Sequence, residues 1–457
     1  MAVEYLCCVH GTLITYDASS NRLRHATGPG VARNAGLMTD DGISSLVCRV
    51  GTEWRRLDGL NGLGQIGLAG SGTAPLRFQS RRQPDDLMSL AANGVWLCAE
   101  ADGAVTLSRQ VAGPWETFCP ISEPACDFLN EVGGGSWIAG SGDIVDGIGI
   151  EPDFRVRVGH LNLPFRTLLD ARHRRNGKEW TVVYNNWMIE RFIPFRPLIY
   201  MIAYGKDEIF ETMGLALRSL HEFGGYAGDV LIFSDRNPQQ LAAYLPPELS
   251  PRTRVAAAPV ADVTDMMAIK FRICDMPELA AYRPFLYLDA DIICNAPIGG
   301  LLVELARAHR IAVTLELDLL GDHNYYGAIL FNSDTTAARR HGRGFSAGLM
   351  GIPSVDVARA TFPAILESMY GLARQQTDRA AMSWIFHDQG VANYVLHKTG
   401  LVDFEIMTPR VTTPVDFNRP LSEIPRLGFA HFCGGVGDAA MKLPSMRAYM
   451  DLLRGKS

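Results

Sequence analysis

The fold of this chain is decided by one stretch, RPFLYLDADII, at residues 283–293. Its apolar, partly aromatic run is typical of a buried β-strand, and two carboxylates, Asp289 and Asp291, leave the end of that strand with one small residue between them. Such a pair is costly to bury unless a positive group neutralises it. A hard cation such as Mn²⁺ or Mg²⁺ does this and also binds phosphate oxygens. The pair alone leaves a second interpretation open, a strand-end turn with two solvated carboxylates.

Strand and helix patterns alternate around this stretch. The apolar run at residues 198–204 ends at Gly205, and a second strand pattern occupies residues 228–235. Helical periodicity is present at residues 209–223, 301–310 and 357–374. The alternation predicts an α/β, Rossmann-like domain with a parallel sheet, which binds its ligands at the carboxyl ends of the strands.

This layout predicts where the first strand contributes to the site. Ala203, Tyr204 and Gly205 stand at the carboxyl end of their strand, as Asp289 does. We therefore expect all four residues to line one crevice.

The first part of the chain has a different texture. Residues 1–160 contain short alternating runs and many turn signals, which predict an all-β domain. A turn glycine followed by two strands recurs from Gly11, Gly94 and Gly135, and three such repeats are typical of a β-trefoil. We expect this trefoil to be an accessory domain.

One repeat, Leu87–Ile121, resembles the repeats of fascin-like and lectin-like β-trefoils. Lectin trefoils usually carry a Gln-x-Trp signature, whereas Glu53 precedes Trp54 and Pro114 precedes Trp115 here. We expect both tryptophans to fill the barrel interior rather than to bind sugar.

Residues 161–195 are interpreted as a linker, and residues 196–457 as the catalytic domain. The linker contains the basic run Arg172–Arg175, interpreted as a solvated face, with phosphate binding as the alternative. Pro194 and Pro197 mark its end.

Composition excludes several classes of protein. The formal charge of −6 provides no basic field for nucleic acid, and no apolar run approaches the length of a membrane span. The start of the sequence lacks the features of a signal peptide, so we expect a cytoplasmic protein. Nine cysteines without metal-type spacing predict reduced, mostly buried thiols.

The segments from residue 199 onward resemble glycosyltransferase family 8, with its glycogenin-like and lipopolysaccharide galactosyltransferase relatives. Tyr-Leu-Asp-x-Asp ends a buried strand in that family, as residues 287–291 do here. Four further segments follow the family order: residues 199–220, Ile269–Arg272, Phe345–Gly351 and His387–Asn393. The last match, Gly428–Gly435 followed by Lys442, resembles the family's His-Phe-x-Gly-x-x-Lys-Pro-Trp, with a longer interval before the lysine.

The resemblance implies a GT-A fold and a role for each matching residue. Asp289, Asp291 and His431 are implied as ligands of Mn²⁺ or Mg²⁺. Donor-binding roles are implied for Ala203, Tyr204, Gly205, Asp289, Ser346, Gly348, Gly434 and Lys442. Catalytic or orienting roles are implied for Lys270, Asp388 and Gln389.

The implied reaction is transfer of a hexose from a UDP-sugar with retention of configuration. The acceptor is left open among a glycan, a small molecule and a protein, including the chain's own tyrosines. No carboxylate is assigned as a nucleophile.

Three alternatives stay open at this stage. Residues 324–332 also match the donor-site strand, although we prefer Phe345–Gly351 and interpret the earlier segment as a sheet edge or a hairpin. Ser346 replaces the usual asparagine, which keeps open a carbohydrate-binding or scaffold protein that has lost activity. A nucleotidyltransferase on a related sheet is the third reading, and the His431 segment argues against it.

Overall fold

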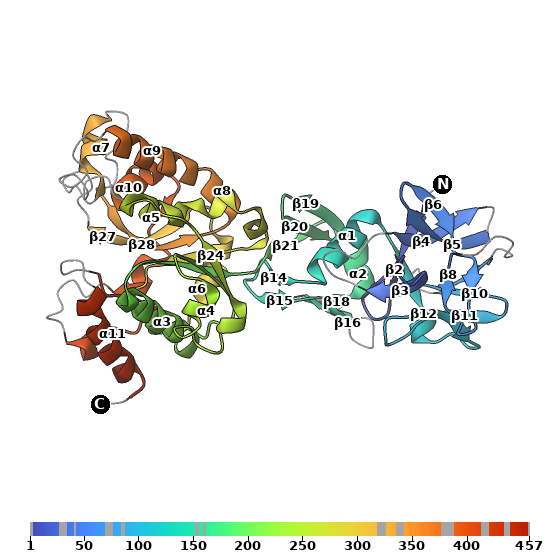
Figure 1. The fold of residues 1–457 in the computed structure, drawn as a ribbon. Coiled ribbons are helices and arrows are strands. Elements are labelled where there is room, and N and C mark those ends of the chain that lie inside the picture. Colours follow the sequence, from blue (N-terminus) through green and yellow to red (C-terminus); the bar gives the residue numbers. More distant parts are fainter. Residues whose placement is uncertain are drawn as a thin grey trace. The chain divides into compact units, whose positions relative to one another are not determined.

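The computed structural model describes residues 3–26, 34–40, 43–68, 76–83, 87–150, 155–158, 161–317, 326–334, 342–375, 388–412, 420–433 and 439–455. The chain divides into two compact units, Met1–Pro194 and Phe195–Ser457 (Figure 1). The sequence predicted a boundary between residues 195 and 196, which is one residue from this division.

The second unit is built on a mixed sheet in the strand order β24-β23-β22-β25-β28-β27-β29. Its strands are β22 Leu198–Ala203, β23 Asp229–Ser234, β24 Thr253–Ala257, β25 Phe285–Leu288, β27 Ile311–Leu317, β28 Gly344–Ile352 and β29 Val402–Asp403. Strands β22 to β25 pair in parallel, as strand–helix alternation predicts, and β28 runs antiparallel between β25 and β27. The carboxyl ends of β22, β23 and β25 therefore meet at one edge of the sheet.

Helices cover both faces of this sheet (Figure 1). One face packs on α3 Asp207–Glu222, α4 Pro238–Leu241 and α6 Gly299–Arg307. The other packs on α5 Val263–Ala268, the 3₁₀ segments η4 Ile269–Asp275 and η5 Pro277–Ala281, α8 Val355–Arg359, α9 Phe362–Gln375 and α10 Asp388–Thr399. The sheet is thus buried on both sides, which explains why β22, β25 and β28 read as nearly continuous apolar runs.

A small second sheet lies beside the main one, in the order β26-β31-β30. Its strands are β26 Ile292–Cys294, β30 Val411–Thr412 and β31 Phe429–His431. Ile293 and Phe432 pack against Met446 and Tyr449 of α11 Ala439–Leu453. This packing fixes the segment that carries His431.

The two competing donor-strand segments have different structures. Phe345–Gly351 lies within β28, beside β25. Asn324 and Tyr325 lie outside the described residues, and the chain that follows forms α7 Ala328–Ser333. A sheet edge or hairpin there is therefore wrong for the described part of the segment.

In the first unit, strands up to Ile121 pair around a ring. The strands are β1 Val3–Cys8, β2 Leu13–Asp17, β3 Arg22–Ala26, β4 Ala35–Asp40, β5 Ile43–Val50, β6 Glu53–Arg56, β7 Gly59–Leu60, β8 Ile66–Gly67, β9 Gln79–Arg82, β10 Met88–Ala92, β11 Val95–Ala99, β12 Val105–Arg109 and β13 Phe118–Ile121. The ring runs β1-β4-β5, passes to β9 through the bridge Ser44–Phe78, and returns through β10 and β13 to β1. Hairpins β2-β3, β7-β8 and β11-β12 lie off it. Leu6, Leu46 and Phe118 belong to the core inside the ring.

Residues 122–194 form further structure in the same unit. They contain α1 Glu123–Val132, α2 Phe165–Asp170, β14 Ser136–Ile138, β15 Ile144–Asp146, β16 Gly149–Ile150, β17 Arg155–Val158, β18 Leu161–Pro164, β19 Arg172–Asn176, β20 Glu179–Tyr184 and β21 Met188–Pro194. The sheets run β15-β14-β21-β20-β19 and β16-β17-β18. Figure 1 shows α1 and α2 beside these strands.

Two expectations fail in this region. The repeat that was expected to begin at Gly135 is instead β14, which pairs with β15 and β21 outside the ring. Residues 161–195 were expected to be a linker, but residues 161–194 are part of the folded first unit. Trp180, Val182 and Phe192 are buried in one core with Phe128 of α1. Their alternating apolar residues are a strand pattern that the nearby arginines concealed.

The two tryptophans expected inside the barrel lie elsewhere. Trp115 is 39% exposed, and Trp54 on β6 is half-buried. The ring interior is filled by smaller side chains such as Leu37, Leu90 and Val105. The barrel-plug interpretation is therefore wrong.

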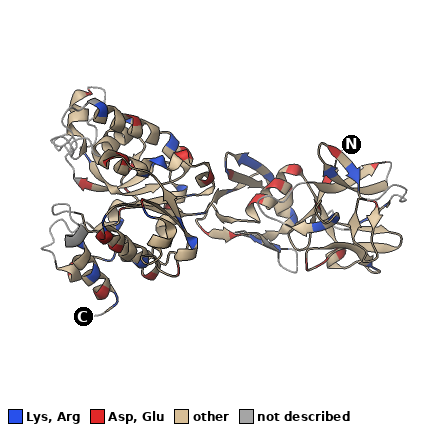
Figure 2. Cartoon of the chain, in the orientation of Figure 1, with Lys and Arg blue, Asp and Glu red and all other residues tan. Residues whose placement is uncertain are grey.

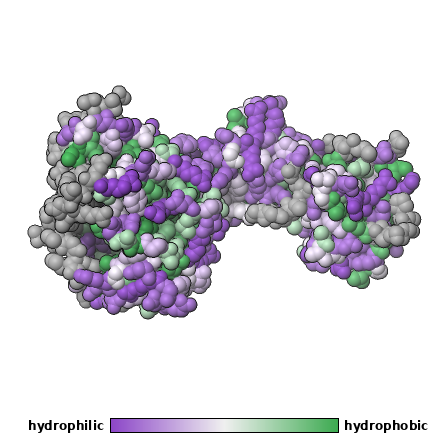
Figure 3. All heavy atoms as spheres, turned by 45° about the horizontal axis from the view of Figure 1, so that its top comes forward, coloured by the Kyte–Doolittle hydropathy of each residue, from purple (hydrophilic) through white to green (hydrophobic). Residues whose placement is uncertain are grey.

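Seven of the nine cysteines are buried, which confirms the burial that the sequence predicted for most of them. In the part of the chain that the structure describes, every helix is too short or too polar to span a bilayer. On the face that Figure 3 shows, apolar residues form small areas among hydrophilic ones.

Candidate metal centre

The centre of the site is built by strands that are far apart in the sequence. Asp289 follows β25, and its backbone N–H donates to the Gly348 carbonyl of β28 at 2.8 Å. Asp291 precedes β26, whose Ile292 pairs with His431 of β31. The Phe432 N–H donates to the Asp291 carbonyl at 2.9 Å, which continues that pairing. Backbone pairing on both sides thus holds the two aspartates in place.

Asp289, Asp291 and His431 form a cluster of potential metal ligands. One ligand atom from each residue lies within 4.8 Å of the other two. The set consists of two carboxylates and one imidazole, and both groups are ligands that Mn²⁺ accepts. The structure therefore brings together the three residues that the sequence assigned to one metal.

The state of Asp291 supports this use. Among the described residues, its buried Oδ1 has no hydrogen-bond donor, and His431 Nε2 lies 3.4 Å away. A buried carboxylate oxygen that lacks a donor is unusual in proteins. A cation bound between Asp291 and its neighbours would satisfy that oxygen.

Lys442 holds the other oxygen of Asp291. Its Nζ lies 2.6 Å from Asp291 Oδ2. Burial acts to raise the pKa of Asp291, but the nearby charges of His431 and Lys442 outweigh burial and lower it. Asp291 is therefore ionised. The interval between Gly434 and Lys442, longer than in the family pattern, still allows the lysine to reach the site.

Lys270 joins Asp289 to Asp388. Lys270 is 5% exposed, and its Nζ lies 2.6 Å from Asp388 Oδ2 and 3.8 Å from Asp289 Oδ1. Burial disfavours the charged lysine, but the two carboxylates outweigh burial and raise its pKa. Lys270 is a buried cation between two acidic groups, one of which is a proposed metal ligand.

Asp289 is the more weakly neutralised of the two aspartates. Burial raises its pKa most, Asp291 adds to the rise, and Lys270 opposes it. The Tyr287 hydroxyl also donates to Asp289 Oδ1. A divalent cation would remove much of the repulsion between Asp289 and Asp291.

Gly348 leaves space for the metal ligands. A Cβ at this position would lie 2.7 Å from Asp289 Oδ2 and 2.8 Å from His431 Cε1. The neighbouring Ser346 is buried, and its Oγ accepts from the Gly348 N–H at 3.3 Å. A side chain at residue 348 would push both ligands out of position.

Helix α10 is attached to β28 by side-chain amides. Gln389 Oε1 accepts from the Ala347 N–H at 3.1 Å. Asn393 bonds both backbone groups of Phe345, accepting from its N–H at 3.0 Å and donating to its carbonyl at 2.9 Å. These bonds fix Asp388, at the start of the helix, beside Lys270.

Ala203, Tyr204 and Gly205 lie at the carboxyl end of β22, next to β25. Tyr200 pairs with Tyr287, so the same register puts Ala203 level with Ala290. The Tyr204 hydroxyl donates to the Ala258 carbonyl at 2.7 Å. Gly205 has φ +87°, and its N–H donates to Asp235 Oδ2 at 3.1 Å. The shared edge expected from the sequence is therefore present.

Three residues at this edge were missed as candidates. Tyr287 contacts Asp289, and its place in the Tyr-Leu-Asp-x-Asp motif was an available signal. Asp235 follows β23, and strand-end position was again the signal. Arg236 donates to the Gly205 carbonyl at 3.2 Å and stacks on the Phe210 ring, with its guanidinium carbon 3.6 Å from the centroid. Gly434 lies outside the described residues.

This arrangement suits an anionic, phosphate-bearing ligand. A cation on Asp289, Asp291 and His431 would attract phosphate oxygens, and Lys442 lies at the same carboxylate. Metal and ammonium groups stabilise charge that develops on a departing phosphate.

Comparisons with known proteins gave no family assignment. No family model matches the chain, and no curated protein matches it. Three solved glycosyltransferase structures resemble part of it at low identity. The galactosyltransferase LgtC with donor and acceptor sugar analogs is 14% identical and has a TM-score of 0.39, covering 56% of this chain and 95% of that one.

An active-site mutant of LgtC is 14% identical with a TM-score of 0.38, covering 57% of this chain and 100% of that one. The bifunctional glycosyltransferase WbbM without ligand is 11% identical with a TM-score of 0.38, covering 58% and 52%. At TM-scores below 0.5 these likenesses do not by themselves define the fold or the activity of this chain.

Proposed function

We propose that residues 195–457 form a GT-A glycosyltransferase domain that transfers a hexose from a UDP-sugar. In this proposal Asp289, Asp291 and His431 hold Mn²⁺ or Mg²⁺. The observation that carries the proposal is this ligand cluster at the carboxyl edge of a mostly parallel sheet, with a buried Asp291 oxygen that has no hydrogen-bond partner in the described part of the chain. When bound, the metal supplies a positive charge to the donor diphosphate.

Two lysines have distinct proposed roles. Lys442 lies at the metal-ligating carboxylate and is suited to contact the diphosphate of the donor. Lys270 lies deeper, with its ammonium between Asp289 and Asp388, and is suited to meet the donor sugar or a phosphate oxygen. The geometry supports this division because one lysine flanks each aspartate of the pair.

The remaining side chains are proposed to place the two substrates. Asp388 and Gln389 start α10 and are proposed to orient the donor sugar and the acceptor. Gly348 and Ser346 belong to β28, which pairs with β25 next to the two aspartates. A sugar can approach the backbone of β28 there. Gly434 keeps its proposed contact with the diphosphate.

The first strand is proposed to hold the nucleoside. Ala203, Tyr204 and Gly205 occupy the carboxyl end of β22, and the positive φ of Gly205 turns the chain there. Retention of configuration is part of the proposal. The acceptor class is a glycan, a small molecule or a protein.

We propose that the ring of strands in residues 1–121 is a β-trefoil with an accessory role. The ring order β1-β4-β5-β9-β10-β13 and the three hairpins outside it support this topology. Its proposed role is to recruit the acceptor or a partner.

Calorimetric titration of the full chain with UDP, with and without Mn²⁺, tests the proposal. We expect Mn²⁺ to tighten UDP binding at least tenfold, because Asp289, Asp291 and His431 would hold the cation, which would supply positive charge to the diphosphate. The variant Asp289→Asn with Asp291→Asn should lose this coupling. UDP binding that is independent of Mn²⁺, or unchanged coupling in the double variant, would contradict the proposal.

The alternative is a sugar-binding or scaffold protein that keeps the donor site without activity. Ser346 in place of asparagine favours this alternative. Donor hydrolysis distinguishes the two, because only an enzyme releases free sugar from a UDP-sugar with Mn²⁺. A panel of UDP-sugars should give one with release well above that of the Asp289→Asn, Asp291→Asn variant.

A further inference from the structure

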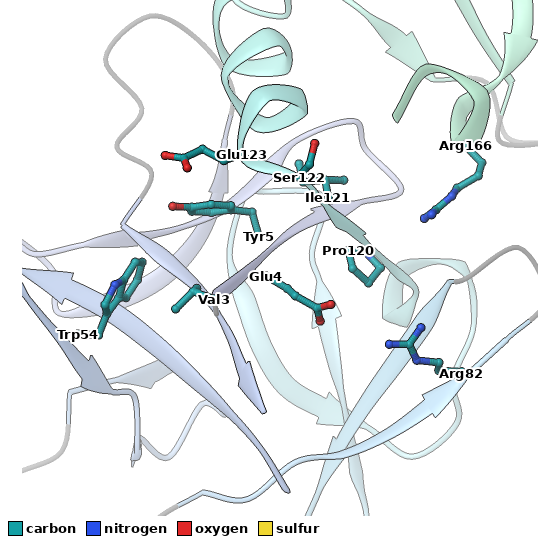
Figure 4. A pocket seen from close by; sticks show the side chains of 10 residues that line it. All are labelled: Val3, Glu4, Tyr5, Trp54, Arg82, Pro120, Ile121, Ser122, Glu123 and Arg166. Atoms are coloured by element: carbon teal, nitrogen blue, oxygen red, sulfur yellow. The ribbon is translucent and has the colours of Figure 1, made fainter. Parts of the chain in front are cut away.

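The first unit contains a cavity of about 600 Å³ that the proposed reaction does not use. It is lined by β1, β6, β9 and the residues around the start of α1, with one residue from α2 (Figure 4). This volume lies within the range of ligand pockets, about 300–1,000 Å³.

Aromatic side chains form one side of this cavity. Tyr5 and Trp54 both line it, and Figure 4 shows them on the same side. Trp54 is half-buried, and its indole N–H has no hydrogen-bond partner among the described residues. An aromatic ring with an available N–H offers an apolar face and a donor at one position.

Charged groups of both signs form the rest of the lining. Glu4 and Glu123 supply carboxylates, whereas Arg82 and Arg166 supply guanidinium groups. In Figure 4 both guanidinium groups lie on the side opposite Trp54, with Glu4 between them and the aromatic rings. Within the described part of the chain, the Glu4 carboxylate takes part in no hydrogen bond or ion pair.

Arg166 is held in place at the cavity wall. Its Nε donates to Asp170 Oδ2 at 2.8 Å, and its Nη1 lies 3.3 Å from Cys119 Sγ. These contacts fix the guanidinium group of Arg166 at the cavity wall.

The mixture of charges selects the kind of ligand. An anion would meet the carboxylates of Glu4 and Glu123, and a cation would meet the two guanidinium groups. A neutral polyhydroxyl molecule has neither conflict, because each hydroxyl donates to a carboxylate and accepts from an arginine. The C–H face of a sugar ring also packs well against an indole or phenol ring.

We infer that this cavity binds a neutral saccharide. It deepens the accessory role proposed for the first unit, since a saccharide held there is a candidate acceptor or product. The site stands apart from the trefoil lectin signature, which the residues before Trp54 and Trp115 lack.

Saturation-transfer NMR on the full chain tests the inference, with lactose, maltose, cellobiose and chitobiose as probes. We expect at least one of the four to bind with a Kd of about 1 mM. Trp54→Ala should weaken that binding at least tenfold. Trp115→Ala is the matched control, because Trp115 is also partly exposed but lies outside this cavity, and it should bind as the unaltered chain does.

A second variant covers the case in which Trp54→Ala loses binding because it misfolds. Glu4→Gln keeps the size of an exposed side chain while removing its charge, and we expect at least threefold weaker saccharide binding. The inference is overturned if no neutral probe binds, if only sulfate or sialyllactose binds, or if Trp54→Ala and Glu4→Gln both bind like the control.

The result is separable from the transferase proposal. The Asp289→Asn, Asp291→Asn variant should keep saccharide binding at this cavity while losing Mn²⁺-coupled UDP binding. If the unaltered chain shows only saccharide binding or only Mn²⁺-coupled UDP binding, the missing one identifies which of the two proposals fails.

Discussion

Titratable residues that are buried or partly buried in this chain are stabilised in two different ways. Lys270, Asp289 and Asp388 neutralise one another. His173 instead lies in an apolar environment, with its ring 4.8 Å from that of Phe128 and no hydrogen-bond partner for either ring nitrogen among the described residues. Burial lowers the pKa of His173 to about 4. A neutral histidine therefore packs beneath α1, in a run whose arginines suggested a solvated linker.

This burial predicts a pH dependence of stability. Because the pKa of His173 is lower in the folded chain than the unfolded value of about 6.5, its contribution is fully present above pH 6.5 and is lost as pH falls towards 4. The loss amounts to about 3 kcal/mol below pH 4.

His173→Phe should remove this component, so the first unit of the variant should lose less stability between pH 6.5 and 4. Urea unfolding at several pH values, followed by tryptophan fluorescence, measures the difference. An identical pH profile in the variant would show that His173 is not buried in its neutral form.

At the scale of single elements, local breaks were harder to anticipate than strands and helices. Periodicity predicted one helix at residues 357–374, whereas the structure has α8 and α9, with Thr361 between them. Pro363 explains the break, since proline has no N–H to continue the hydrogen bonds of α8 and its ring clashes with the preceding turn, whereas it is tolerated in the first turn of α9. The apolar spacing continues across the break because both helices pack on the same core.

Two glycines of strand β28 allow neighbouring side chains to pack closely against its backbone. Gly348 lies against Asp289 and His431, and Gly351 lies against Leu305, where a Cβ would approach to 2.3 Å. At both positions a Cβ would force the neighbouring side chain to move, even though neither residue is in a turn.

Gly348→Ala tests this requirement. We expect Mn²⁺-coupled UDP affinity to fall at least tenfold, because the new Cβ would displace two metal ligands, and stability to fall by about 1–3 kcal/mol. Gly371→Ala in α9 is the matched control, because a Cβ there meets no atom within 4 Å.

The control should leave UDP binding unchanged and raise stability by about 0.5–1 kcal/mol. Titration of both variants with UDP and Mn²⁺ makes the comparison. Equal UDP affinity in the two variants would mean that residue 348 has no steric role at the metal site.

At the scale of the whole molecule, the chain consists of two units with separate cores. The clusters around Leu6 and Phe128 belong to the first unit, and those around Phe271 and Met213 belong to the second. Acidic and basic residues are interspersed over both units (Figure 2). Each unit therefore has the apolar core that independent unfolding requires.

We expect two unfolding transitions in scanning calorimetry of the full chain. UDP at a hundred times its Kd, with Mn²⁺, should stabilise only the second unit, by about 2.7 kcal/mol, which corresponds to about 5–10 °C for a unit of this size. A single transition that shifts as a whole would mean that the units unfold together.

Much of the second unit was predictable because its information is local. Strand β25, the position of the aspartate pair and helix α3 follow from consecutive residues. The first unit was harder, since residues 122–194 alternate apolar and charged residues in short strands, and repeat counting assigned Gly135 to a ring to which it does not belong.

The sequence by itself determined strands β22, β23 and β25 and helix α3, and that Asp289 and Asp291 end a buried strand. Only the tertiary structure decided which cations reach them. Lys442 is 151 residues from Asp291 in sequence, and Lys270 reaches Asp388 from another element. It also decided that Trp54 faces a cavity rather than the barrel core. The physical reason is that local patterns report backbone conformation, whereas the partners of a side chain depend on how distant elements pack.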